Sequence, residues 1–163
     1  MLKTKDGLDL FTQRWTVSDP KALVLHHHGF NDHSGRSPHV ARALNDAGYS
    51  LYGFDWRGQG RSGGARGHTP DYETPLDDYG LVIAEAKKDR SGKKSFPLKI
   101  SILLVHGGAD PVTNPKATEE FYQRVAFADK TFKRYEGQYH ELHNETDPML
   151  MLRDVVEWLS GHI

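Results

Sequence analysis

Four groups of polar and small residues each follow a short apolar run, and they hold most of the side chains that could do chemistry. They are residues 28–30 (HGF), 55–62 (DWRGQGRS), 106–112 (HGGADPV) and 137–141 (GQYHE). Carboxylate and imidazole groups serve as general acids and bases in enzymes. The chain has ten histidines and no cysteine, so thiolate nucleophiles, disulfides and cysteine-based zinc sites are excluded.

The apolar runs that precede these groups predict short strands. Three of them, residues 22–25, 51–54 and 102–105, are too short for helices and do not alternate with polar residues. Such runs are typical of strands buried on both faces, as in a parallel sheet. Residues 131–135 alternate, which favours a strand nearer an edge. At the start, Asp6-Gly7 is a hairpin turn signal.

Four helices are predicted from a repeated start signal, in which a capping side chain precedes a proline. The pairs are Ser37-Pro38, Thr74-Pro75, Asn114-Pro115 and Asp147-Pro148. Proline at the first helical position sacrifices no needed hydrogen bond. Gly48 and Gly92 are the predicted stops of the first two helices. The alternation of strands and helices predicts a three-layer α/β sandwich with a mostly parallel sheet and an N-terminal hairpin, in one domain of residues 1–163. Ligands bind at the carboxyl ends of the strands in such sheets, where the four groups lie.

Taken in order, the four groups resemble the α/β-hydrolase fold and, within it, the monoacylglycerol lipase-like serine hydrolases. The resemblance covers residues 23–159 and rests on the strings HGF-NDHSGR, FDWRGQGRSGG-RGH, LLVHGGADPV and YEGQYHELHNE. It implies hydrolysis of carboxylic esters of glycerol or similar alcohols, a small-molecule ester or lipid substrate, and no cofactor. It also implies that Asp110 and His140 belong to a Ser-His-Asp triad, and that the backbone N–H of Phe30 contributes to the oxyanion hole.

In that reading His140 takes the proton of a serine hydroxyl, and Asp110 orients the imidazole and stabilises its charged form. The serine itself is missing, so the nucleophile is unknown. The Gly-x-Ser-x-Gly turn is expected before the strand at 102–105, but a polar segment stands there instead. We interpret this segment, residues 90–97, as the junction of a deletion or omission. Residues 60–64 match the pattern in a loop, so Ser62 is interpreted as a decoy.

Three origins of the missing segment remain open: omission from the sequence, deletion, or completion by another chain. Two other functions also remain open. One is a catalytically silent pseudo-hydrolase that binds or acts as a scaffold. The other is metal-assisted hydrolysis through His28 with His106 or His140 and Asp110, although no metal site is predicted. Residues 26–28 cannot converge on one ion, because successive strand side chains point to opposite faces. Asp55 is predicted to anchor its own loop.

Charge and hydropathy exclude two further classes of protein. Lys and Arg number 21 against 22 Asp and Glu, a net charge of −1, which argues against nucleic-acid partners and a polybasic membrane patch. No apolar run is long enough to span a bilayer. The first residues lack the apolar core of a signal peptide, so we expect a cytoplasmic protein. The sequence does not indicate an oligomeric state.

Overall fold

The computed structural model describes residues 1–71, 73–88, 101–125 and 128–162. The chain divides into two compact units, Met1–Ser95 and Phe96–Ile163, called here the first and the second unit. The organisation as one domain stays a prediction. The proposed junction at 90–97 lies outside the described residues.

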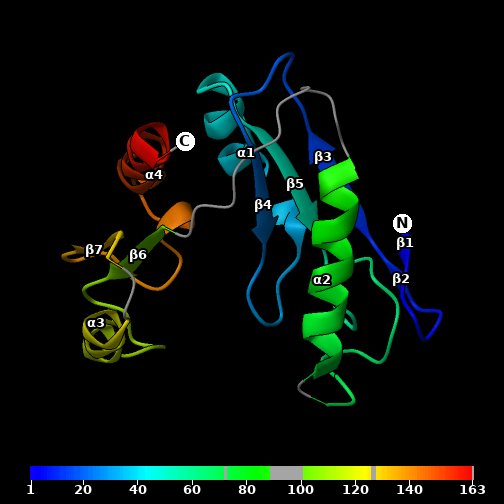
Figure 1. Ribbon diagram of the computed structural model, residues 1–163. Coiled ribbons are helices and arrows are strands. Elements are labelled where there is room, and N and C mark those ends of the chain that lie inside the picture. The colour runs from blue at the N-terminus through cyan, green and yellow to red at the C-terminus, as the bar shows by residue number, and fades with distance from the viewer. Residues whose placement is uncertain (72, 89–100, 126–127, 163) are drawn as a thin grey trace. The chain divides into compact units, whose positions relative to one another are not determined.

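The first unit is built on a hairpin and a three-stranded sheet (Figure 1). Strands β1 (Leu2–Lys3) and β2 (Asp9–Leu10) pair antiparallel, as the Asp6-Gly7 signal predicts. The sheet has the order β3-β5-β4, with β4 (Leu23–His27) parallel to β5 (Ser50–Phe54) and β3 antiparallel to β5. Sequence analysis missed β3 (Thr12–Trp15), because the stretch TQRW contains no apolar run.

Helices cover both faces of β5, all five residues of which are buried. Tyr52 and Phe54 pack with Val82 and Ala86 of α2 (Glu73–Lys88) in the core of the unit. Leu51 faces the opposite side of the sheet because side chains alternate along a strand. Helix α1 (Pro38–Asp46) crosses between the two parallel strands and contacts β5 and β3. The first unit therefore has the layering expected of an α/β fold.

The second unit is a β-α-β arrangement followed by a helix (Figure 1). Strand β6 (Ile102–Gly107) pairs in parallel with β7 (Lys130–Tyr135), and α3 (Pro115–Arg124) connects them. The short 3-10 turn η2 (Leu142–Asn144) then leads to α4 (Pro148–His162). The described strands thus belong to three separate sheets, whereas the sequence predicts one mostly parallel sheet.

Two strands are less buried than predicted. The apolar residues of β4 and β6 are only partly buried, while β5 is fully buried. In the described sheets, β4 and β6 are edge strands, whereas β5 is a central strand with a neighbour on each side. A strand with a neighbour on one edge alone is covered less completely, which accounts for the difference.

Three of the four helices begin at the predicted proline, and α2 begins two residues before Pro75. Asn114 caps α3 as predicted, because its side chain accepts the Lys116 N–H at 2.9 Å. Ser37 does not cap α1; its hydroxyl instead hydrogen-bonds to His26 Nε2 at 2.8 Å. Gly48 follows α1 with a φ of +87°, which suits the predicted stop, and Gly92 lies outside the described residues.

Candidate active site

The loop that follows β6 buries the Asp110 carboxylate at the sheet's carboxyl edge. The backbone N–H groups of Val112 and Thr113 donate to Oδ1 at 2.7 and 3.0 Å. The Thr113 hydroxyl donates to Oδ2. The side chain of Asp110 is only 2% exposed, so these bonds replace its lost contacts with water.

A close backbone approach sets the loop after β7 against the end of β6. A Cβ on Gly107 would lie 1.9 Å from the carbonyl oxygen of Tyr139, so only glycine allows this contact. The Ala109 N–H donates to the Gln138 carbonyl at 2.9 Å, which ties the two loops together. The residue after this contact is His140, and its position is therefore set by the backbone.

His140 and Asp110 meet as the sequence predicts. His140 Nδ1 lies 2.9 Å from Asp110 Oδ2, and the imidazole is 46% exposed. Burial raises the pKa of Asp110, but hydrogen bonds from Thr113 and His140 outweigh it and hold that pKa well below its usual range. The carboxylate is therefore ionised at neutral pH and can only accept hydrogen bonds. Nδ1 of a neutral His140 must carry the proton, which leaves Nε2 with a lone pair that can accept one.

A second imidazole contacts the same carboxylate, although sequence analysis grouped His106 with Asp110 only in the metal alternative. His106, 9% exposed at the end of β6, places Nε2 at 3.0 Å from Asp110 Oδ2. The four-residue separation of His106 and Asp110 across a strand end could have indicated this contact. Asp110 Oδ2 thus lies between two histidines.

Phe30 lies in the loop after β4 of the first unit and is 74% exposed. Its N–H has no hydrogen-bond acceptor among the residues that the structure describes. The preceding His28 is buried, with Nδ1 2.7 Å from the Gly29 carbonyl and Nε2 accepting the Trp56 N–H at 3.1 Å. His28 therefore connects the loop after β4 to the loop after β5.

Ser62 is buried and its hydroxyl is already used. Oγ donates to the Asp55 carbonyl and accepts the Phe11 N–H at 2.9 Å. Gly60, which opens the Gly-x-Ser-x-Gly match, has a φ of +50°, and a Cβ there would lie 2.1 Å from Asp55 Oδ2. Loop geometry accounts for this glycine, and the contacts support the interpretation of Ser62 as a decoy.

Asp55 anchors the loops of the first unit, as predicted. Its carboxylate accepts the Ser34 N–H and hydroxyl at 2.7 and 2.6 Å and the Arg61 N–H at 2.8 Å.

The serines of the second unit bond to other partners than His140. Ser101 donates to Asp129 and Ser160 to the Val156 carbonyl. No serine in the described ranges hydrogen-bonds to His140.

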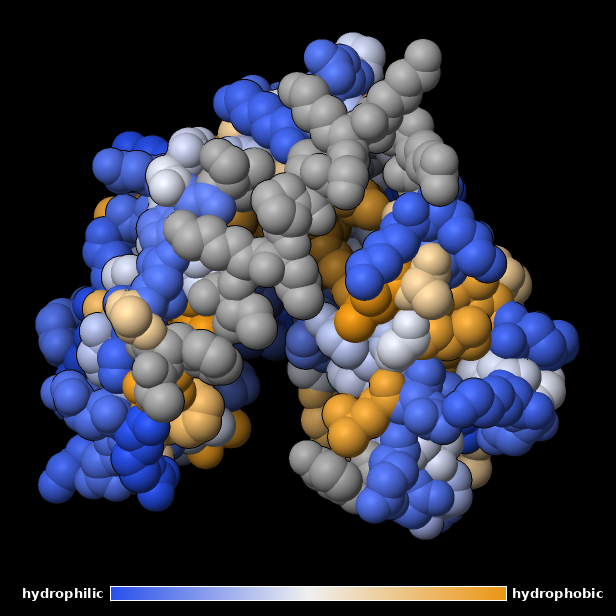
Figure 2. Space-filling view, viewed as in Figure 1, coloured by the Kyte–Doolittle hydropathy of each residue, from blue (hydrophilic) through white to orange (hydrophobic). Residues whose placement is uncertain are grey.

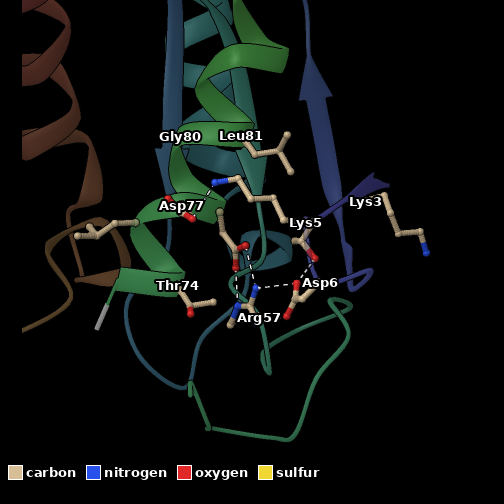
Figure 3. Close-up of a pocket in the computed structure, with 11 residues that line it drawn as sticks. Lys3, Lys5, Asp6, Arg57, Thr74, Asp77, Gly80 and Leu81 are labelled. Carbon is tan, nitrogen blue, oxygen red and sulfur yellow. Dashed lines mark hydrogen bonds and ion pairs between the residues drawn. The ribbon is translucent and has the colours of Figure 1, made fainter. Parts of the chain in front are cut away.

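A cavity of about 570 Å³ in the first unit is lined by charged side chains (Figure 3). Arg57 lies between two carboxylates: it donates Nε–H and Nη2–H to Asp78 at 2.6 and 2.9 Å, and Nη1–H to Asp6 at 3.0 Å. Lys5 bonds to Asp77 at 3.0 Å at the same cavity. Because Asp78 belongs to α2 and Asp6 to the hairpin, Arg57 ties these elements to the loop after β5.

A second cavity of the first unit, about 330 Å³, lies beside Phe30. The residues that line it include Trp56, Pro75, His28 and His68. Trp56 stacks on Tyr79 with 6.0 Å between ring centroids. The cavity is therefore partly lined by aromatic residues, among them Phe30, whose backbone N–H the sequence resemblance assigns to the oxyanion hole.

The described residues contain neither a metal-ligating cluster nor a membrane-spanning helix. Among them, no group of three or more histidine, aspartate and glutamate side chains is placed to hold a metal ion. None of the helices in the described ranges has the length and apolarity to cross a membrane. Figure 2 shows apolar side chains exposed at several places on a mostly hydrophilic surface.

The chain has the α/β-hydrolase fold, as solved structures show. A soluble variant of monoglyceride lipase from Saccharomyces cerevisiae, in complex with a substrate analogue, superposes with a TM-score of 0.80. That match covers 99% of this chain and 95% of the other, with 15% identity. The family model described as Serine aminopeptidase, S33 matches residues 18–98 and again residues 93–147. The chain belongs to this family.

Curated relatives are longer than this chain. Monoacylglycerol lipase from Mycolicibacterium smegmatis is 37% identical over 84 residues, 51% of this chain and 30% of the relative. An uncharacterized abhydrolase domain-containing protein of Dictyostelium discoideum is 26% identical over 269 residues, 99% of this chain and 29% of the relative. The chain thus spans less than a third of the length of these two relatives. The second match also extends over many more residues than this chain contains.

Proposed function

We propose that this chain carries the acid–base part of a carboxylic-ester hydrolase of the monoacylglycerol lipase type. The observation that supports the proposal is the 2.9 Å hydrogen bond between His140 Nδ1 and the buried Asp110 carboxylate, with the imidazole half exposed. In such a pair the histidine takes a proton at Nε2 and returns it to the leaving alcohol. The ionised aspartate keeps the tautomer and stabilises the imidazolium.

The substrate class proposed is a small ester or lipid, with monoacylglycerols as the leading candidates. The monoacylglycerol and monoglyceride lipases among the relatives and solved structures support it. The Phe30 N–H is the proposed donor to the oxyanion, and removal of one such donor typically raises the barrier by about 3–4 kcal/mol. Ser-His-Asp chemistry needs no cofactor. The cytoplasmic location expected from the sequence stays a prediction.

We further propose that the nucleophilic serine belongs to a segment that is missing from this sequence, and that residues 90–97 mark the junction where it would stand. Two findings support this: the family model matches the chain in two pieces that meet at 93–98, and the Dictyostelium match extends over 269 residues. Ser62 cannot replace that serine while its hydroxyl is bound to Asp55 and Phe11. Water is then the nucleophile left to His140, so this chain alone hydrolyses esters slowly and without a covalent intermediate.

The experiment measures hydrolysis of p-nitrophenyl butyrate and labelling by a fluorophosphonate probe, alongside the intact mass of the protein. We expect no stoichiometric labelling, no burst of product, and slow turnover that a chelator does not change. His140→Ala should reduce that turnover to the buffer rate. Ser62→Ala should leave it unchanged, as should His143→Ala, which removes another histidine from the same loop.

Two results would contradict the proposal. Turnover that survives His140→Ala would remove His140 from the chemistry, and single-site labelling at Ser62 would make that serine the nucleophile. Chelator-sensitive turnover would instead indicate metal-assisted hydrolysis.

A silent pseudo-hydrolase is the second candidate, favoured by the lack of a serine partner for His140 among the described residues. It predicts that monoacylglycerol binds while product never rises above the buffer rate.

A further inference from the structure

His106 is a buried side chain that the proposed function leaves without a role. It lies in β6, and each of its ring nitrogens has a partner within hydrogen-bond distance. Nε2 is 3.0 Å from Asp110 Oδ2 and 3.2 Å from the Thr113 hydroxyl, whose own proton goes to Asp110, and Nδ1 is 2.7 Å from the Thr118 hydroxyl in α3. Being only 9% exposed, His106 cannot reach a substrate and can act only through these neighbours.

The partners of His106 decide which nitrogen of the neutral ring carries the proton. The Asp110 carboxylate is ionised, because hydrogen bonds outweigh burial and hold its pKa well below the usual range. A bare Nε2 at 3.0 Å would set its lone pair against those of Oδ2. Nε2 therefore carries the proton and donates to Asp110, while Nδ1 accepts from the Thr118 hydroxyl.

The position of Oδ2 depends on these contacts. A carboxylate offers about four lone-pair positions, and backbone N–H groups occupy those of Oδ1. Oδ2 is the atom that His140 needs, at 2.9 Å from its Nδ1. Of the other two donors to Oδ2, Thr113 belongs to an exposed part of the loop, whereas His106 is buried and bound at both nitrogens. His106 is thus the rigid donor.

We propose that His106 is a positioning residue for the Asp110–His140 pair. Thr118 holds it in the Nε2–H tautomer, and the Nε2–H fixes the Asp110 carboxylate with Oδ2 directed at the His140 Nδ1–H. The inference rests on the proposed function and deepens it. It adds a hydrogen-bonded chain that runs from α3 through β6 to the exposed imidazole.

The test is long-range ¹H–¹⁵N NMR of the histidine rings in the full chain, with His140→Gln used to assign the His140 signals. In the wild type we expect His140 in the Nδ1–H tautomer with a downfield Nδ1 proton. His106→Leu should make solvent exchange of that proton about tenfold faster and mix the two tautomers, because the Asp110 carboxylate loses the hydrogen bond that holds it in place. His106→Gln, whose amide N–H can replace Nε2–H, should restore the wild-type signal.

A second pair of variants keeps the test decisive if His106→Leu does not fold. Thr118→Val removes the hydroxyl at nearly constant shape and should speed the exchange, while Thr118→Ser should not. Thr131→Val is the matched control, since Thr131 in β7 bonds to the Trp158 indole at 3.2 Å. It should not alter the His140 signals.

The outcomes separate the inference from the proposed function. Unchanged His140 exchange and tautomer in both His106→Leu and Thr118→Val would overturn the positioning role while the Asp110–His140 pair stands. If Asp110→Asn leaves the His140 signals of the wild type unchanged, the pair itself does not form in solution, and both proposals fail. Loss of the signal in Thr131→Val as well would show a general loosening of the unit, which also overturns the positioning role.

Discussion

Two aspartates share the Arg57 guanidinium, and they allow a buried ion pair to be compared with an exposed one. Asp78 receives two of its N–H groups, and the side chains of Asp78 and Arg57 are 3% and 7% exposed. Asp6 also receives two guanidinium hydrogen bonds, at 3.0 and 3.3 Å, but its side chain is 56% exposed. Asp78→Asn and Asp6→Asn each remove one negative charge from the same cation at nearly constant shape, so they form a matched pair of perturbations.

The two substitutions should differ strongly in cost. Asp78→Asn leaves the Arg57 charge buried without its closest counter-charge, and loss of one partner of a buried pair costs about 3–5 kcal/mol. Asp6→Asn should cost much less, because solvent already screens that carboxylate. Hydrogen bonds from Arg57 and from the Thr4 hydroxyl hold the pKa of Asp6 well below its usual range. The contribution of Asp6 to the free energy of unfolding is therefore present above about pH 4, the pKa of an aspartate in the unfolded chain, and is lost as the pH falls further.

The assay is urea unfolding at pH 7 followed by tryptophan fluorescence. A Trp158→Phe background leaves Trp15 and Trp56, both in the first unit, as the reporters. With a slope of about 1–3 kcal/mol per M, Asp78→Asn should lower the midpoint by at least about 1 M. Asp6→Asn should lower it by a small fraction of that amount.

Equal shifts for the two variants would refute the reasoning, since burial would then not decide the strength of the pair. A rescue variant sharpens the comparison. Arg57→Met combined with Asp78→Leu removes both buried charges, and such replacements are often neutral or stabilising. We expect the double variant to recover most of the midpoint lost in Asp78→Asn. A double variant as unstable as the single one would show that the loss comes from packing rather than from the uncompensated charge.

Three further predictions concern single side chains. Ser62→Ala should lower the free energy of unfolding by about 1–3 kcal/mol, measured by urea unfolding, because the partly buried Phe11 N–H and the buried Asp55 carbonyl lose their partner. Burial, and then the hydrogen bond to Asp154, raise the pKa of Tyr135 above about 10, its value in the unfolded chain. The contribution of the protonated hydroxyl to the free energy of unfolding is therefore fully present below about pH 10 and is lost at higher pH. Tyr135→Phe should therefore be less stable than wild type at pH 8, with a gap that narrows above pH 10; a constant gap would contradict the assignment. Asn114→Ala should cost about 1 kcal/mol through loss of the α3 cap, and an unchanged thermal midpoint would refute that role.

Local patterns in the sequence predicted most of the secondary structure. Apolar runs located β4, β5 and β6, and a capping residue before proline located the starts of α1, α3 and α4 to the residue. These signals are local because a helix start or a buried strand is specified by neighbouring side chains. Strand β3 was missed because its residues are mostly polar; its strand identity comes from pairing with β5, Trp15 opposite Leu51.

The candidate site shows the same division. The resemblance of sequence strings predicted that Asp110 and His140 would meet, and the hydrogen bond between them is present. The role of His106 was not visible, since its link to Thr118 depends on how α3 packs against β6. Ser37 also differs from its local expectation, because a hydrogen bond to His26 replaces the cap.

Sequence by itself determined the class of fold, the order of its elements apart from β3, and the residue types at the strand ends. Tertiary structure decided which polar atoms are satisfied by which partners. A hydroxyl, carboxylate or imidazole has several possible partners nearby in the chain, and burial selects among them by penalising every polar atom left unpaired. That selection explains why Ser62 is tied to the Asp55 loop while the Asp110 carboxylate faces two histidines.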